Sequence, residues 1–303
     1  MVAGASAALA FQIQESYISD GVMTLESSEV MKTLWVLGIV AGSVLVTACS
    51  RGPAPAKPGT SAFFWQVAQQ SYHAGDLLKT DGVLLDLSRR QNGYASRARI
   101  VQLVVSAGIT QGLWELSDAY QAGSEVTPAR LRTEAFNLRS QAAGTALEFT
   151  QAVHDLASDQ EPTICFEFPF PPGSVARPIE LSKVSAGEWL SDWEREGLER
   201  AILQRGVILA VTYAVGAAND SAMAATEFQS GNAQIPRAVF LTGMARLLYQ
   251  QANVFGAKGL DRADRYLVMA REALETVQSL PPTPETAQLA AKIEATIKNV
   301  SGI

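Results

Sequence analysis

Three observations predict that this chain folds as an all-α protein. Apolar residues recur three and four positions apart through most of residues 61–303, as they do along one face of a helix. Helix-start and helix-stop signals such as Thr127-Pro128 and Pro281-Pro282 punctuate that pattern. Strand-like alternation is clear only in residues 164–170. With 48% hydrophobic and 18% charged residues the chain can bury a sizeable core, so we predict one helical domain over residues 61–303.

The first half of this domain is expected to hold the longer helices. Thr127 can cap a helix, and Pro128 suits its first turn because that position needs no backbone N–H. We therefore predict a helical pair that turns at Gly75-Asp76, a helix over about residues 97–120, and a helix from Pro128 to about Ala157.

The second half begins with a helix-start signal of a different kind. Ser185-Ala-Gly-Glu188 has the pattern of a capping box, in which the serine and the glutamate each satisfy an orphan backbone N–H. It predicts a helix that runs to about Val215 and bends at Gly206. Residues 207–215 are apolar on most faces, so we expect the central buried helix there. Helices over about residues 236–255, 261–279 and 283–300 bring the expected number to eight or nine.

One segment departs from the helical pattern. Residues 164–170 alternate in hydrophobicity and lead into a proline-rich loop over residues 169–178. Because proline cannot donate to a strand ladder, the segment cannot be a central strand. We expect an extended Phe/Pro-rich loop that either acts as a lid or connects two helical halves.

The helical pairs resemble tetratricopeptide-type hairpins. In residues 259–279, Ala263, Leu267, Ala270 and Leu274 are spaced along one helix, and alanines at such positions let a neighbouring helix come close. The first pair, with Trp65, Ala68 and Tyr72 before the turn, is similar. No clean 34-residue period links the pairs. The resemblance therefore implies degenerate hairpins that stack into one bundle or solenoid.

Residues 31–50 have the order of a bacterial lipoprotein signal peptide. Lys32 gives a short positive region, residues 34–46 form an apolar run, and Val46-Thr-Ala-Cys49 matches the lipobox pattern. The run of thirteen residues is shorter than the roughly 20 that span a bilayer. The alternative is a buried helix that happens to end in Ala-Cys. We predict cleavage before Cys49 and lipid attachment to its thiol.

The flanking segments fit this arrangement. Residues 49–60 are rich in proline and alanine and are expected to be a tether between the membrane and the folded body. The residue after the lipidated cysteine resembles the type that sorts bacterial lipoproteins to the outer membrane, because it is a serine, Ser50. We therefore expect the protein to lie on the periplasmic face of the outer membrane. Residues 1–30 are expected to be a non-native or disordered extension, with translation starting at Met31; the alternative is a long and unusually acidic signal n-region.

Composition excludes several classes of function. The net charge of −6 and the absence of a basic cluster argue against nucleic-acid binding. Two histidines and two cysteines make a metal site unexpected, and no cofactor-binding motif is found. If Cys49 is lipidated, Cys165 has no disulfide partner. Its apolar neighbours favour a buried, inert thiol.

Two groups of residues could carry acid–base chemistry. His73 precedes Asp76, and His154 precedes Asp155, but no nucleophile motif accompanies either histidine. The carboxylates of residues 188, 192 and 196 are spaced i, i+4, i+8, and nearby arginines favour a solvated, salt-bridged face. We therefore expect that the protein is not an enzyme, while an envelope hydrolase with an unrecognised site stays an alternative.

Aromatic residues suggest a ligand site. Trp189 and Trp193 lie four residues apart, which favours a packing pair over a ligand platform. They follow soon after the loop that carries Phe166, Phe168 and Phe170. We predict that these five residues line one apolar cleft that binds a ligand.

The predicted anchor, tether and helical body together resemble the lipoprotein T-component of TRAP-type transport systems. That resemblance is architectural, and it implies a helical scaffold that partners a periplasmic solute-binding protein and can hold a hydrophobic ligand. We predict a lipid-anchored envelope protein that acts by binding a protein or an apolar small molecule. The alternative is an accessory component of a TRAP-type transporter.

Overall fold

The computed structural model describes residues 56–158, 161–217, 220–229 and 231–302. These residues confirm the all-α prediction: ten α-helices and one 3₁₀ helix pack together, and the described strands form a single two-stranded sheet. The predicted extension (1–30), signal peptide (31–48) and lipidated Cys49 lie outside the described residues. None of the described helices is long and apolar enough to cross a membrane.

The described body begins at Ala56, five residues before the predicted domain boundary. The Ala56 N–H donates to Oε1 of Gln66 at 3.2 Å, and the Thr60 hydroxyl donates to the carbonyl of Lys57 at 2.7 Å. Thr60 also caps the first turn of α3, because its hydroxyl accepts from the N–H of Phe63. Residues 56–60, predicted as the end of the tether, are therefore fixed to the first helix.

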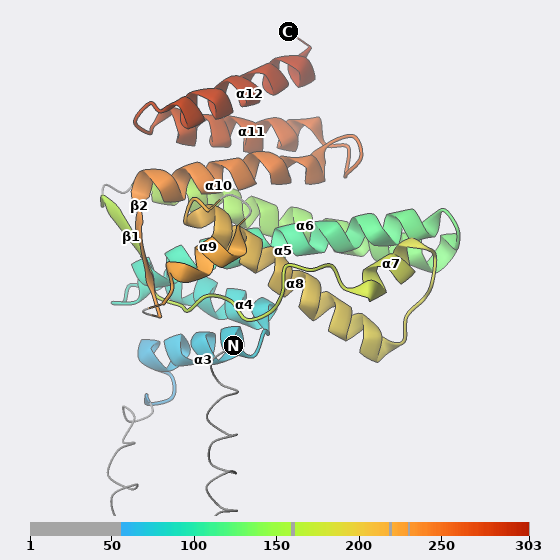
Figure 1. The fold of residues 1–303 in the computed structure, drawn as a ribbon, viewed down its shortest axis with the longest axis horizontal. Helices are drawn as coiled ribbons and strands as arrows, with labels where there is room; N and C mark the ends of the chain where they lie inside the picture. The colour runs from blue at the N-terminus through green and yellow to red at the C-terminus, as the bar shows by residue number, and fades with distance from the viewer. Residues whose placement is uncertain (1–55, 159–160, 218–219, 230, 303) are drawn as a thin grey trace, which may run out of the picture. The chain divides into compact units, whose positions relative to one another are not determined.

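Four helices build the first half of the body, and consecutive helices pack on each other (Figure 1). Asp76 caps the second helix at the predicted turn, and Pro128 opens the fourth at the predicted position. The fourth helix ends at Ala157, as predicted. The bounds are α3 (Ser61–His73), α4 (Leu77–Ser88), α5 (Ala95–Ser124) and α6 (Pro128–Ala157).

The predicted start of the central helix was wrong. Ser185 ends a short helix, α7 (Ile179–Ser185), and α8 (Asp192–Ala214) starts seven residues later. A capping box does start α8, but Ser191 and Glu194 form it. Gly187 explains the break, because its φ of +92° lies in the left-handed region, which a continuous helix does not allow.

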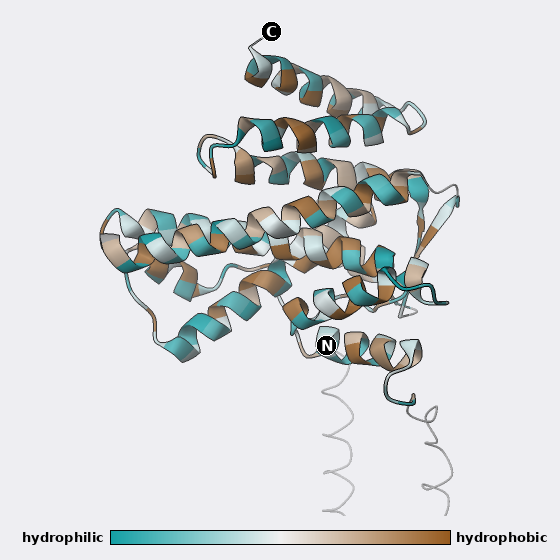
Figure 2. Ribbon diagram, turned by 180° about the vertical axis from the view of Figure 1, so that it is seen from behind, coloured by the Kyte–Doolittle hydropathy of each residue, from teal (hydrophilic) through white to brown (hydrophobic). Residues whose placement is uncertain are grey.

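The C-terminal half of α8 is the buried central helix that was predicted. It crosses α5 at a site where both helices carry glycines. A Cβ on Gly108 would overlap the backbone of Val207, and one on Gly206 would overlap the carbonyl of Gly108. Figure 2 shows the N-terminal half of α8 as mostly hydrophilic, in keeping with burial that starts at Leu198. The two backbones thus approach more closely than any larger residue would allow.

The Phe/Pro-rich segment contains the first strand of the small sheet. β1 (Thr163–Phe166) pairs antiparallel with β2 (Ala233–Pro236), and Ile164 lies opposite Ile235. Phe166 and Phe168 are fully buried, so the segment is part of the core. Of the two roles expected for it, the structure supports the connection between helical halves.

The C-terminal helices form the top layers of the stack in Figure 1. α11 packs against both α10 and α12, so it buries two sides. Ala270 is fully buried as predicted, whereas Ala263 is exposed at the start of the helix. The elements are α9 (Ser221–Thr226), α10 (Arg237–Gln251), the 3₁₀ helix η1 (Ala252–Phe255), α11 (Ala263–Gln278) and α12 (Pro284–Ser301).

Candidate functional site

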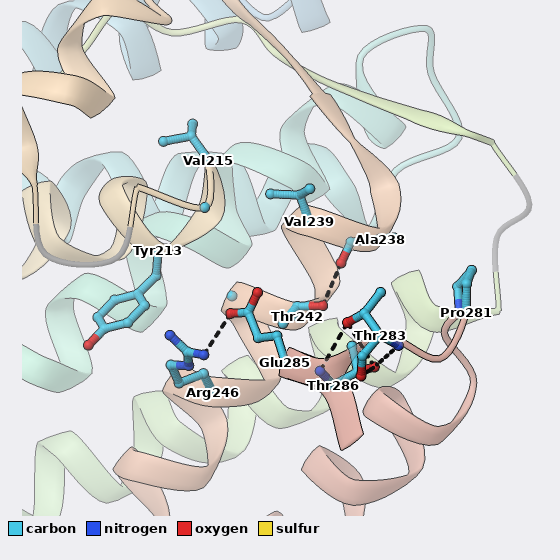
Figure 3. A pocket seen from close by; sticks show the side chains of 12 residues that line it. Tyr213, Val215, Ala238, Val239, Thr242, Arg246, Pro281, Thr283, Glu285 and Thr286 are labelled. Carbon is cyan, nitrogen blue, oxygen red and sulfur yellow. Dashed lines mark hydrogen bonds and ion pairs between the residues drawn. The ribbon is translucent and has the colours of Figure 1, made fainter. Parts of the chain in front are cut away.

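A cavity of about 330 Å³ lies where the end of α8, the first half of α10 and the start of α12 meet (Figure 3). This volume lies at the lower end of the range typical of small-molecule sites, roughly 300–1,000 Å³. The lining residues are Tyr213, Val215, Gly216, Ala238, Val239, Thr242, Gly243, Arg246, Pro281, Thr283, Glu285 and Thr286.

Close backbone contact between α8 and α10 forms one side of the cavity. Gly243 of α10 lies against the carbonyl of Tyr213, where a Cβ would overlap it. After α8 ends, Gly216 turns the chain with a φ of +75°, beside the side chain of Val239. The absence of side chains at these two glycines brings the ends of the helices together and leaves the aliphatic side chains of Val215 and Val239 on the cavity wall.

A capping box at the start of α12 forms the opposite side. The hydroxyl of Thr283 accepts from the Thr286 N–H at 3.1 Å, and the hydroxyl of Thr286 accepts from the Thr283 N–H at 2.8 Å. The Thr242 hydroxyl donates to the carbonyl of Ala238 at 2.7 Å. Because these three hydroxyls are already bonded within the protein, the wall offers a ligand mainly apolar contact.

Two charged side chains line the cavity, Arg246 and Glu285. The Nη2 of Arg246 donates to Oε1 of Glu285 at 2.7 Å, which ties α10 to the first turn of α12. A guanidinium has five N–H donors in a fixed fork, so one such bond leaves capacity for an acceptor on a ligand. The cavity can therefore combine an apolar contact with a hydrogen bond to an anionic group.

This ion pair also lines a second cavity, of about 250 Å³. Tyr249, Leu289 and Lys292 lie on that side, and the Lys292 ammonium is 5.8 Å from the centre of the Tyr249 ring. The two cavities therefore lie along one surface formed by α10 and α12, with Arg246 and Glu285 shared between them. We call this surface the α10–α12 groove.

The predicted phenylalanines lie in the core. Phe168 meets Trp65 and Tyr72 edge-on, each at 5.0 Å between ring centres. Phe166 and the half-buried Phe170 both contact Phe228, at 5.6 and 5.7 Å. These rings thus pack against other aromatic side chains of the body, and such contacts stabilise the fold.

The predicted tryptophans lie elsewhere, and the prediction that they pack as a pair was wrong. Trp189 precedes α8 and contacts Tyr120, with the Arg130 guanidinium 4.2 Å from its ring centre. Trp193 lies in the first turn of α8 and is 81% exposed. Because Trp189 lies before the helix begins, the four-residue spacing does not place the two rings on one helix face. None of the five predicted ligand-binding aromatics lines the cavities of the α10–α12 groove.

The histidines and Cys165 lie apart from the groove. His73 is exposed, and Asp76 caps α4 instead of meeting it. His154 has its Nδ1 3.2 Å from the carboxylate of Glu272, not near that of Asp155. Cys165 is free and half-buried within β1.

The carboxylate series also takes a different form from the one predicted. Asp192 lies at the start of α8 and pairs with Arg195 at 2.5 Å, which agrees with a salt-bridged surface. Glu188 lies before the helix begins, so it does not share a helix face with Glu196. Among the described residues, no cluster of three or more potential metal ligands occurs.

Sequence reasoning missed the groove for a physical reason. Its residues come from two helices, the end of a third and a loop, and most are small or aliphatic. The available local signal was Thr283-Pro284, which predicted the start of α12 correctly. No known protein family matches the chain, and no curated protein or solved structure is significantly similar to it.

Proposed function

We propose that this chain is a bacterial envelope lipoprotein, anchored through Cys49, that acts by binding an apolar small molecule with an anionic end. The lipobox at residues 46–49 supports the anchor and the location at the envelope. Several acyl chains on one cysteine hold a protein stably on a membrane, whereas one chain gives only marginal binding. The outer membrane is the proposed site.

The observation that carries the binding function is the make-up of the α10–α12 groove. Val215, Val239 and Pro281 offer apolar contact, and Arg246 supplies a charged donor at the junction of the two cavities. A ligand with an apolar body and a carboxylate or sulfonate would satisfy both features. Burial of the apolar part would supply affinity, and the guanidinium would fix the orientation.

The anchor is tested by replacing the acceptor thiol. In cells, Cys49→Ser should leave an uncleaved, unacylated precursor, because the hydroxyl does not receive the lipid. Cys165→Ser is the matched control and should be processed as the wild type is. Immunoblotting of fractions and metabolic labelling with a fatty acid measure both steps. Normal cleavage and labelling of the Cys49→Ser variant would contradict the anchor.

The groove is tested with the fluorophore ANS, an apolar naphthalene sulfonate. Val239→Trp should fill the first cavity and weaken ANS binding about tenfold, which corresponds to about 1.4 kcal/mol. Val268→Trp places the same bulk on α11, on a side chain that is also partly exposed, and should bind ANS as the wild type does. Fluorescence titration of the purified proteins gives the two dissociation constants.

A second variant separates charge from shape in the same assay. Arg246→Gln keeps much of the side-chain volume but removes the guanidinium, so it should weaken ANS binding several-fold. The exposed Arg271 of α11 provides the control substitution Arg271→Gln. If Val239→Trp and Arg246→Gln both bind ANS with wild-type affinity, the groove is not the binding site.

A further inference from the structure

Charge is distributed very unevenly along the folded body. Residues 56–100 carry six Lys and Arg side chains against three Asp side chains, a net charge of +3. Residues 101–303 carry sixteen Lys and Arg side chains against twenty-three Asp and Glu side chains, a net charge of −7. Four of those basic side chains and all three Asp side chains precede α5 and belong to the α3–α4 end of the body, which lies opposite α12 in the stack (Figure 1). An anionic surface would repel the strongly acidic remainder, so the α3–α4 end is the end of the body that can approach it most easily.

Several basic and aromatic side chains gather around the start of α3. Lys57 is exposed in the turn that leads into the helix, and Arg90 is exposed just after α4, where it also pairs with the exposed Asp86 at 2.5 Å. The guanidinium of Arg90 lies 5.0 Å from the centre of the Phe64 ring. Phe63 is half-exposed, and its ring meets that of Phe64 at 5.8 Å. We call Lys57, Phe63, Phe64 and Arg90 the α3 end.

The position of the proposed anchor limits where this end can be. Ala56, the first described residue bonded to the body, comes seven residue steps after Cys49. At no more than about 3.6 Å per step, the chain between them can reach at most about 25 Å. With lipid on Cys49, the start of α3 must therefore stay within that distance of the bilayer. The distance falls whenever the chain is less than fully extended.

From the charge, the aromatic side chains and the length of chain to Cys49, we propose that the α3 end rests on anionic phospholipid headgroups of the membrane. This inference rests on the lipid anchor proposed above. Lys57 and Arg90 pair with lipid phosphates, Arg90 through guanidinium donors beyond the one that meets Asp86, and the ring of Phe63 enters the boundary between headgroups and acyl chains. The α10–α12 groove then lies toward the end of the body away from the membrane, because α12 is at the other end of the stack from α3 (Figure 1).

Vesicle binding tests this surface without the lipid. The protein used is residues 49–303 with Cys49→Ser, which keeps the whole described core, from Trp65 to Ile293. It should sediment with vesicles that contain phosphatidylglycerol and not with phosphatidylcholine alone. Lys57→Glu with Arg90→Glu should weaken this binding at least about tenfold, since each basic residue near an anionic membrane contributes appreciably. Added salt should weaken wild-type binding as well.

The control has the same change of charge at the other end of the stack. Arg271→Glu with Lys298→Glu alters two exposed side chains of α11 and α12 and should leave vesicle binding within about twofold of the wild type. Equal loss in the two double variants, or wild-type binding by Lys57→Glu with Arg90→Glu, overturns the inference. Intact mass of the protein from cells reports acylation of Cys49 separately, so failure of the anchor and failure of the α3 end give different results.

Discussion

Gly108→Ala should destabilise this protein strongly although it adds one methyl group. A Cβ at residue 108 would overlap the Cα, the N and the side chain of Val207, and helix backbones cannot move apart without opening the core. Overpacking of this kind costs about 1–3 kcal/mol and sometimes more. In a domain of this size each kcal/mol lowers Tm by about 2–4 °C. We expect a fall of about 5–10 °C, measured by thermal unfolding followed by circular dichroism.

Gly144→Ala is the matched control for this substitution. Gly144 lies in α6, a helix of the same length, and a Cβ there would meet no atom within 4 Å. Alanine favours the helix over glycine by about 0.8–1.0 kcal/mol, so this variant should melt slightly above the wild type. If Gly108→Ala melts as high as Gly144→Ala, the close crossing of α5 and α8 is wrong.

Asp81→Asn should make the protein more stable at neutral and alkaline pH. Asp81 is buried on α4, where it accepts from Nε2 of Gln102 at 3.2 Å. Burial first, and the nearby Glu148 second, raise the pKa of Asp81 to about 7. Neutral asparagine can keep a bond to Gln102 and has no charge to bury.

Stability depends on pH because the pKa of Asp81 differs between the folded and the unfolded chain. The unfolded chain loses this proton near its ordinary pKa of about 3.9, whereas the folded protein keeps it until about pH 7. Folding therefore takes up a proton between these values, and stability falls as pH rises through that window. One pKa unit corresponds to about 1.4 kcal/mol, so the loss is on the order of 4 kcal/mol by pH 8.

Urea unfolding near pH 5 and near pH 8 measures this effect. The wild type should lose stability between the two values, and Asp81→Asn should lose much less. Asp86→Asn is the control on the same helix, because Asp86 is exposed and pairs with Arg90. An identical loss in the wild type and Asp81→Asn would show that the Asp81 carboxyl is not held neutral in the fold.

The sequence predicted those elements whose signals are local. Pro128 and Thr283-Pro284 mark the starts of α6 and α12 correctly, because a cap and a proline act within one turn. The start of α8 was missed because two Ser-x-x-Glu patterns, at Ser185 and Ser191, occur close together. Both satisfy the same local rule. The left-handed turn at Gly187, which lies against Val126 and Thr127, interrupts the chain after the first pattern and leaves Ser191 to start α8.

Features that depend on distant parts of the chain were not predictable in this way. β2 has four residues, and its register is set by β1, about seventy residues earlier in the chain. The aromatic residues that suggested a ligand site are instead partners of Trp65, Tyr72 and Phe228, contacts that no local pattern reveals. The α10–α12 groove likewise depends on how three helices end and start against one another.

The central claim is a protein anchored at Cys49 that presents a helical binding body at the bacterial envelope. Intact-mass measurement of the protein purified from membranes of a bacterial host tests it most directly. We predict a polypeptide that starts at Cys49 and carries the mass of attached acyl chains. A polypeptide that starts upstream of Cys49, with an unmodified thiol at that residue, would contradict the claim.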